Sequence, residues 1–134
     1  MNTWIMPCNL KYFDINERFD SYDYVVWKNG AKILKDDVVY IYVGKPYSCI
    51  KYKCVVEDPD VEKSVLDENA YARIGEIERN RKYMKLKKIY AYEDGITLAK
   101  LQELGLFGVR KQTRMDRKVL AYMNEIDSQI VSEE

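Results

Sequence analysis

Residues 36–46 read Asp36-Asp37-Val38-Val39-Tyr40-Ile41-Tyr42-Val43-Gly44-Lys45-Pro46, a turn followed by an apolar run that ends at a Gly/Pro break. Side chains alternate along a strand, which places Val39, Ile41 and Val43 on one face and Val38, Tyr40 and Tyr42 on the other. Because neither face is polar, the run indicates a strand at the centre of a barrel or sandwich. The tyrosine hydroxyls also make this strand a candidate wall for a pocket.

Strands and short helices are predicted on both sides of this run. Residues 48–56 alternate as a half-buried strand does and are expected to pair antiparallel with residues 38–43 across the Gly44–Tyr47 turn. Further strands are predicted at 4–8, 24–27 and 83–92, and helices at 15–21, 98–104 and from 117 to about 126, with Asp14, Thr97 and Asp116 as N-caps. The acidic residues 57–78 are expected to form a loop. The predicted class is α+β, with a small antiparallel sheet curled into a barrel and flanked by short helices.

Length and composition favour one globular domain over residues 1–127, followed by a polar tail at 128–134. The chain has 134 residues, 47% of them apolar and 33% charged, which is enough to bury a single core. No signal-peptide pattern or membrane-length apolar run is present, so we expect a cytoplasmic protein without membrane contact. The twelve tyrosines and two tryptophans either fill a small β-core or form a stacking surface for a planar ligand.

The chain has no histidine, which excludes Ser-His and Cys-His nucleophilic catalysis and removes the commonest transition-metal ligand. Cys8, Cys49 and Cys54 form no Cys-x-x-Cys pair and are expected to be buried free thiols. Asp58-x-Asp60-x-Glu62 could hold Mg²⁺ or Ca²⁺, but it lacks the glycine and distal glutamate of an EF-hand loop, which favours a solvated acidic loop. We therefore expect no enzymatic activity, no cofactor and no metal site.

The formal net charge is zero, yet basic residues gather in two segments. Residues 79–88 carry six lysines and arginines and no acid, and residues 110–118 carry five with only Asp116 between them. Either cluster alone is explained by a solvated surface. Two such clusters on a neutral chain also permit one basic face that contacts the phosphates of a nucleic acid.

Several short motifs follow one another in a familiar order: Trp4-Ile5-Met6-Pro7-Cys8-Asn9, Trp27 after two valines, the Asp37–Tyr42 run, Ile50-Lys51-Tyr52-Lys53, and Gly108-x-Arg110-x-Gln112-x-Arg114. This order resembles the EVE domain, a family of the PUA-like superfamily, over about residues 3–123. The resemblance implies a curled barrel whose pocket holds a flipped or single-stranded base, often a modified one. It also implies DNA or RNA as partner, and a nuclease that acts alongside. The chain departs from the family pattern at Asp36-Asp37, where Gly-Asp is usual, and at Arg110-Lys111, where Gly-Pro is usual.

Four residues are candidates for such a base pocket: Asn9, Trp27, Tyr42 and Ser48. A base stacked on Trp27 would contribute ~1–3 kcal/mol, although a core tryptophan is the alternative. The amide of Asn9 offers a donor and an acceptor, and its alternative role is a local Asx turn. The hydroxyls of Tyr42 and Ser48 flank the central hairpin, and for Ser48 a turn hydrogen bond explains the residue as well.

Four further residues, Arg110, Lys111, Gln112 and Arg114, are candidates for contacts with the nucleic-acid backbone or base edges. Solvated surface is their alternative role. The predicted function is a non-catalytic nucleic-acid reader that recognises a base, including a modified base, in an aromatic pocket. The alternatives are a protein- or small-molecule-binding module on the same barrel, and a metal-dependent nuclease.

Overall fold

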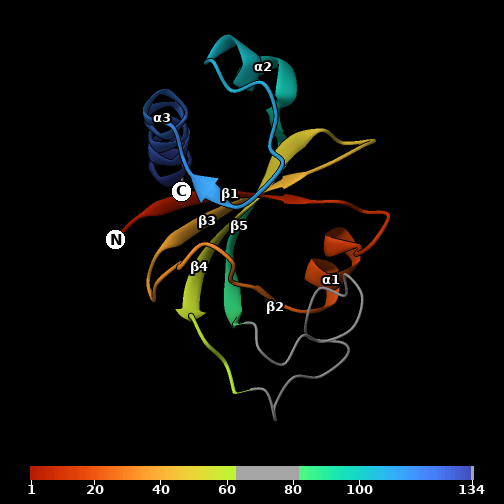
Figure 1. The fold of residues 1–134 in the computed structure, drawn as a ribbon. Coiled ribbons are helices and arrows are strands. Elements are labelled where there is room, and N and C mark those ends of the chain that lie inside the picture. The colour runs from red at the N-terminus through yellow and green to blue at the C-terminus, as the bar shows by residue number, and fades with distance from the viewer. Residues whose placement is uncertain (63–81, 134) are drawn as a thin grey trace.

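The computed structural model describes residues 1–62 and 82–133, and its centre is one curled, half-barrel sheet of six strands (Figure 1). The elements are β1 (Thr3–Cys8), α1 (Ile15–Ser21), β2 (Tyr24–Lys28), β3 (Val38–Val43), β4 (Cys49–Asp58), β5 (Tyr83–Thr97), α2 (Leu98–Glu103), β6 (Thr113–Arg114) and α3 (Arg117–Glu133). The predicted α+β class is confirmed. Most of the expected acidic loop, and the start of the first basic cluster, lie outside the described residues.

The strands lie in the order β2-β5-β4-β3-β1-β6. Neighbours are antiparallel except β1 and β3, which run parallel with Cys8 opposite Val43. The predicted antiparallel hairpin of β3 and β4 is confirmed. The parallel pair matters for the site, because it brings the ends of β1 and β3 to the same edge of the sheet.

The central strand β3 is buried on both faces, as its sequence predicts. Val39, Ile41 and Val43 belong to a core cluster that includes Ile15 and Phe19 of α1. Tyr40 and Tyr42 belong to a second cluster on the opposite face. That second cluster is covered by α2 and α3 through Leu101, Val119 and Met123. A strand between two cores needs apolar side chains throughout, which explains the unbroken run.

The sheet departs from simple alternation at β-bulges. The register between β4 and its neighbours shifts between Ile50 and Tyr52, so Ile50 faces the second core and Tyr52 the first. β5 also runs to Thr97 instead of ending at Tyr92, because β4 pairs with it as far as Cys49. Gly95 has a φ of 71°, and a Cβ there would lie 2.5 Å from the Cys49 sulfur, so only glycine fits.

Each helix begins directly after a residue whose side chain caps its N-terminus. Asp14 accepts a hydrogen bond from the Glu17 amide at 3.1 Å, and Thr97 accepts one from Lys100 at 3.2 Å. At α3, Asp116 accepts one from Lys118 at 2.9 Å. These three predicted N-caps are confirmed.

The C-terminal helix is longer than its sequence pattern predicts. α3 continues through Glu133, so residues 128–133 are helical although the sequence predicts a polar tail there. Ile130 packs partly buried against the second core, which supports the added turns. The three cysteines are buried and free, as predicted. None of the helices in the described part of the chain is long and apolar enough to cross a membrane.

Candidate functional site

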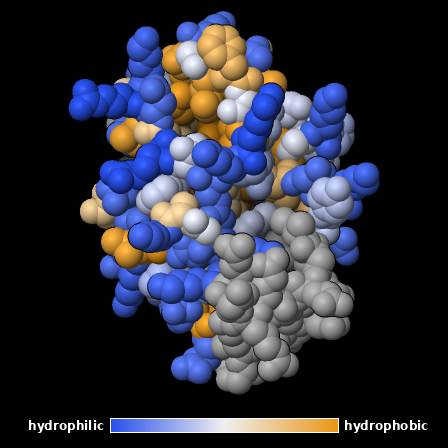
Figure 2. Space-filling view, viewed as in Figure 1, coloured by the Kyte–Doolittle hydropathy of each residue, from blue (hydrophilic) through white to orange (hydrophobic). Residues whose placement is uncertain are grey.

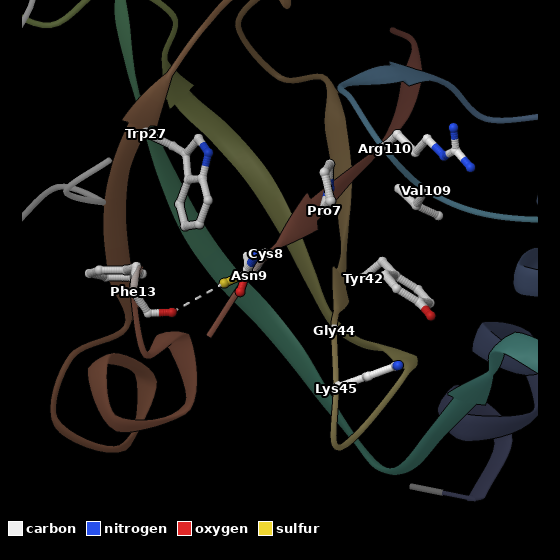
Figure 3. Close-up of a pocket in the computed structure, with 10 residues that line it drawn as sticks. All are labelled: Pro7, Cys8, Asn9, Phe13, Trp27, Tyr42, Gly44, Lys45, Val109 and Arg110. Atoms are coloured by element: carbon white, nitrogen blue, oxygen red, sulfur yellow. Dashed lines mark hydrogen bonds between the residues drawn. The ribbon is translucent and has the colours of Figure 1, made fainter. Parts of the chain in front are cut away.

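A cavity of about 560 Å³ lies at the end of β1 (Figure 3). Its lining residues are Pro7, Cys8, Asn9, Phe13, Trp27, Tyr42, Gly44, Lys45, Val109 and Arg110. β6 pairs only with Trp4 and Ile5, so the edge of β1 from Pro7 onward has no neighbouring strand on that side. The cavity therefore occupies a place where the sheet edge is left open.

Three loops meet at this end of β1. The Gly44 amide donates a hydrogen bond to the Cys8 carbonyl at 3.0 Å, which fixes the β3–β4 turn against the start of the β1–α1 loop. The loop between α2 and β6 contributes Val109 and Arg110. The parallel pairing of β1 with β3 brings the first two loops together, and the pairing of β6 with β1 brings the third.

One side of the cavity is aromatic and apolar. Phe13 meets Trp27 edge to face, with ring centroids 5.5 Å apart and an interplanar angle of 89°. The Trp27 side chain is 6% exposed, so it serves the core and the cavity wall together. Among the described residues its indole N–H has no hydrogen-bond acceptor, and it is not among the side-chain nitrogens sealed from solvent. The indole N–H is therefore a donor that no described residue satisfies.

Cys8 lies beside these rings as a neutral thiol. Its sulfur is 3.5 Å from the Phe13 carbonyl oxygen, to which it donates. Burial raises the pKa of Cys8 to about 12. A thiol with such a pKa is not a nucleophile at neutral pH, so here Cys8 contributes an apolar surface.

The other side of the cavity is polar and basic. Figure 3 shows Arg110, Val109 and Tyr42 across the end of β1 from Trp27, with the Tyr42 hydroxyl directed away from the indole. Arg110 and Lys45 are exposed, and neither forms an ion pair with a carboxylate of residues 1–62 or 82–133. Their charges are available to an anionic ligand.

Asn9 lines the cavity next to Cys8, at the end of β1 (Figure 3). Its Oδ1 accepts a hydrogen bond from the Lys11 amide at 3.0 Å, which is the Asx turn that the sequence left open as an alternative. The Nδ2 group of Asn9 has no acceptor among the described residues. The residue thus holds its loop with one end of the amide and leaves the other end for a ligand.

The structure brings Asn9, Trp27, Tyr42 and Arg110 to one cavity but leaves Ser48 out of its lining. Ser48 has a φ of 47° and lies in the turn, where its amide donates to Gly44 and its carbonyl accepts from Leu98. Ser48 therefore takes part in the turn through its backbone.

The four candidate residues at 110–114 have different environments in the structure. Gln112 donates to the Lys28 carbonyl at 2.6 Å and accepts from the Gly30 amide at 3.0 Å, so it ties its loop to the end of β2. Arg114 donates to Asn2 at 2.9 Å and its guanidinium lies 5.5 Å from the Trp4 ring centroid. Lys111 is exposed and is not part of the lining. Of these four residues, only Arg110 lines the cavity.

The sequence did not single out Phe13, Lys45, Pro7 or Val109 as site residues. Their convergence depends on the pairing of β1 with β3 and β6, and the parallel β1–β3 pair has no local sequence signal. Within residues 1–62 and 82–133 no three Cys, Asp or Glu side chains gather as a metal site, and Asp58 instead accepts from the Asp60 amide.

The sequence matches no protein-family model and no curated protein. Solved structures do match it. A hypothetical protein from Leishmania major is 14% identical, with a TM-score of 0.65 and 96% of each chain covered. A protein from Pseudomonas syringae, PSPTO5229, is 13% identical, with a TM-score of 0.63 over 92% of this chain and 98% of the other.

A point mutant of the ASCH protein of Zymomonas mobilis is 13% identical, with a TM-score of 0.61 over 93% of this chain and 96% of the other. ASCH proteins belong to the PUA-like superfamily. The predicted PUA-like fold is therefore confirmed, whereas the narrower EVE assignment stays a prediction. At these identities the likeness concerns the fold: the chain folds as the PUA-like ASCH proteins do.

Proposed function

We propose that this protein binds nucleic acid and holds one base of a single-stranded or locally unpaired strand in the cavity at the end of β1. One observation carries the proposal: the Trp27 indole and two cations, Arg110 and Lys45, that pair with no described carboxylate line the same 560 Å³ cavity. Recognition of an unstacked base requires an aromatic surface, groups that read its hydrogen-bonding edge, and cations for its phosphates. The cavity offers all three.

The proposed roles follow from position. Phe13 and the accessible part of Trp27 form the apolar wall against which the base packs. The Asn9 amide and the indole N–H read the edge of the base, which carries both acceptors and donors. Arg110 and Lys45 contact the phosphates on either side of it. The cavity volume lies within the range of small-ligand pockets, so a modified base belongs among the ligands to be tested.

We propose recognition without catalysis. The chain lacks histidine, and burial raises the pKa of Cys8, Cys49 and Cys54, so these thiols stay protonated at neutral pH. The PUA-like fold shared with ASCH proteins supports RNA as the first nucleic acid to test, with DNA of the same sequence alongside.

The test is oligonucleotide affinity in variants of the cavity. Asn9→Ser keeps a side-chain acceptor for the turn but removes the amide donor, so we expect affinity to fall roughly tenfold, the equivalent of one hydrogen bond. Trp27→Phe keeps a ring in the core but removes the N–H, and a loss of similar size is expected. Calorimetry with five-nucleotide RNA and DNA, unmodified or carrying a modified central base, measures both variants.

The fluorescence of Trp27 gives a second readout. In a Trp4→Phe variant Trp27 is the remaining tryptophan, so a base in the cavity should quench its emission. Trp27→Ala is unsuitable, because Trp27 belongs to the first core cluster and its truncation would cost about 3–5 kcal/mol of stability.

Ser48→Ala is the matched control, since Ser48 lies in the neighbouring turn but outside the lining. We expect it to bind as the unmodified protein does. Equal losses in Ser48→Ala and Asn9→Ser would contradict the cavity assignment. An absence of oligonucleotide binding at low salt would contradict nucleic-acid recognition altogether.

A further inference from the structure

The three loops around the cavity each carry an exposed aromatic side chain close to a basic one. Tyr12, in the loop of residues 9–13, is 55% exposed and follows Lys11. Tyr47, in the turn of residues 44–48, is 49% exposed and lies two residues after Lys45. Phe107, in the loop of residues 104–112, is 75% exposed and precedes Arg110. We call these three loops the mouth loops.

Each ring lies close in the chain to a residue that lines the cavity. The Tyr12 amide donates to the Asn9 carbonyl at 3.0 Å, and the Tyr47 amide donates to the Gly44 carbonyl at 3.1 Å. Phe107 lies two residues before Val109, which is part of the lining. Figure 2 shows hydrophobic residues gathered at the end of the molecule where α2 lies, the element that precedes the Phe107 loop.

The placement of these rings is selective. In the part of the chain that the structure describes, four aromatic side chains are largely exposed, and three of them belong to the mouth loops. The fourth, Tyr22, lies against the Arg18 guanidinium, 3.8 Å from its ring centroid. Single exposed apolar residues are ordinary, but rings gathered around one cavity indicate a binding surface.

The charge of the mouth loops is one-sided. Residues 9–13, 44–48 and 104–112 contain Lys11, Lys45, Arg110 and Lys111, and the acids next to them in the chain are Asp14, the N-cap of α1, and Glu103, the last residue of α2. The Lys51 ammonium also lies 4.4 Å from the Tyr47 ring centroid, and that of Lys11 lies 5.7 Å from the Tyr12 centroid. Aromatic faces beside cations match the bases and phosphates of a single strand, whose bases are free to stack.

We propose that Tyr12, Tyr47 and Phe107 are stacking platforms for the nucleotides that flank the base in the cavity. The protein then binds a single-stranded segment of about four nucleotides, one in the cavity and the others on the rings. This inference rests on the proposed function, because it needs a base in the cavity to set the register of the strand. Paired bases are hidden within a duplex and cannot use these platforms.

A length series tests the inference. Affinity is measured for a nucleoside monophosphate and for RNA strands of three, five and nine nucleotides of one sequence. It is also measured for a longer duplex that contains the five-nucleotide sequence in paired form. We expect affinity to rise up to about four nucleotides and then level off. The duplex is expected to bind more weakly than the single strand.

Alanine variants of the three exposed aromatic residues test whether these rings cause the rise of affinity with strand length. Phe107→Ala should leave binding of the monophosphate unchanged and weaken the five-nucleotide strand roughly 5- to 150-fold, the worth of one stacked base. Tyr12→Ala and Tyr47→Ala are expected to act in the same way. Tyr22→Ala is the control, since this exposed ring lies outside the mouth loops, and it should change neither affinity.

The outcomes separate this inference from the proposed function. If the monophosphate binds and longer strands bind no better, the platforms are overturned and the cavity assignment stands. A length effect that persists in the triple Tyr12/Tyr47/Phe107→Ala variant, or equal affinity for duplex and single strand, also overturns the platforms. If neither the monophosphate nor any oligonucleotide binds, the proposed function fails and this inference fails with it.

Discussion

Asp37 shows how one buried carboxylate can organise the start of the sheet. It is 2% exposed and accepts hydrogen bonds from the Asn2 amide at 2.9 Å, the Trp4 indole at 2.9 Å and the Leu34 amide at 3.0 Å. Burial alone would raise the pKa of Asp37, but these hydrogen bonds outweigh it and lower the pKa below its ordinary value of 3.8. Asp37 thereby joins β1 to the entry of β3, and Trp4 has a structural role.

This environment predicts an acid-dependent loss of stability. A carboxyl whose pKa is lowered on folding stabilises the protein above its unfolded pKa, and that contribution disappears as the pH falls through the folded pKa. We expect Asp37→Asn to lower the free energy of unfolding by about 2 kcal/mol near neutral pH, because the charged acceptor is lost. The difference between variant and parent should shrink as the pH falls below 3.8.

Urea unfolding of both proteins, from about pH 7 down to about pH 2.5, measures this difference. A gap that stays constant across the range would show that the Asp37 charge does not contribute to stability. Asp36→Asn is the control at the adjacent position, where the side chain is exposed, and it should leave the curve unchanged.

Among the elements, α3 contacts the sheet through apolar side chains and through the carboxylate of Asp127. Asp127 accepts from Tyr40 at 2.6 Å, from Lys53 at 2.9 Å and from Tyr92. Burial alone would raise the pKa of Asp127, but these donors lower it, and burial together with the carboxylate raises the pKa of Tyr40 and Tyr92. The second core therefore depends on a carboxylate that joins three strands to one helix.

Removing that carboxylate should loosen α3. We expect Asp127→Asn to cost about 2–3 kcal/mol in unfolding free energy, since three donors lose a charged acceptor in a site that is only partly exposed. Glu125→Gln on the same helix is the control, because Glu125 is exposed, and its effect should stay within about 0.5 kcal/mol. Thermal or urea unfolding compares them, and equal stability of the two variants would show that Asp127 does not hold the helix.

The net charge of the whole molecule does not indicate a nucleic-acid partner. The positions of its charged residues are more informative. The net charge is zero, so long-range attraction gives no reason to expect nucleic acid. The mouth loops nevertheless bring Lys11, Lys45, Arg110 and Lys111 to one opening. Salt dependence of binding should then report only the few phosphates that contact these loops, not the charge of the whole protein.

The salt slope of RNA affinity is thus a prediction for the whole molecule. We expect log affinity to fall linearly with log salt, with a slope of about −2 to −3, equal to roughly 0.7 per phosphate contact. Arg110→Ala should reduce the slope by about 0.7, whereas Arg117→Ala, an exposed arginine outside the cavity lining, should leave it unchanged. Calorimetry at four salt concentrations measures the slopes, and equal changes in both variants would contradict a phosphate contact specific to Arg110.

Local chemistry in the sequence was enough for several features. The unbroken apolar run of β3 requires burial on both faces, and the caps at Asp14, Thr97 and Asp116 start their helices because each satisfies amides within a few residues. The Asx turn of Asn9 is likewise local, because its side chain accepts from an amide two residues later. Each of these features depends on neighbours along the chain.

Other features arose from contacts between distant segments. The bulge at Ile50, the extension of β5 and the turn role of Ser48 depend on strand pairing that no local pattern encodes. The same holds for the arrival of Phe13, Lys45 and Arg110 at one cavity, because the pairing of β1 with both β3 and β6 places three separate loops together. Residue types along the chain specified which groups could bind a base, and long-range packing specified which of them meet.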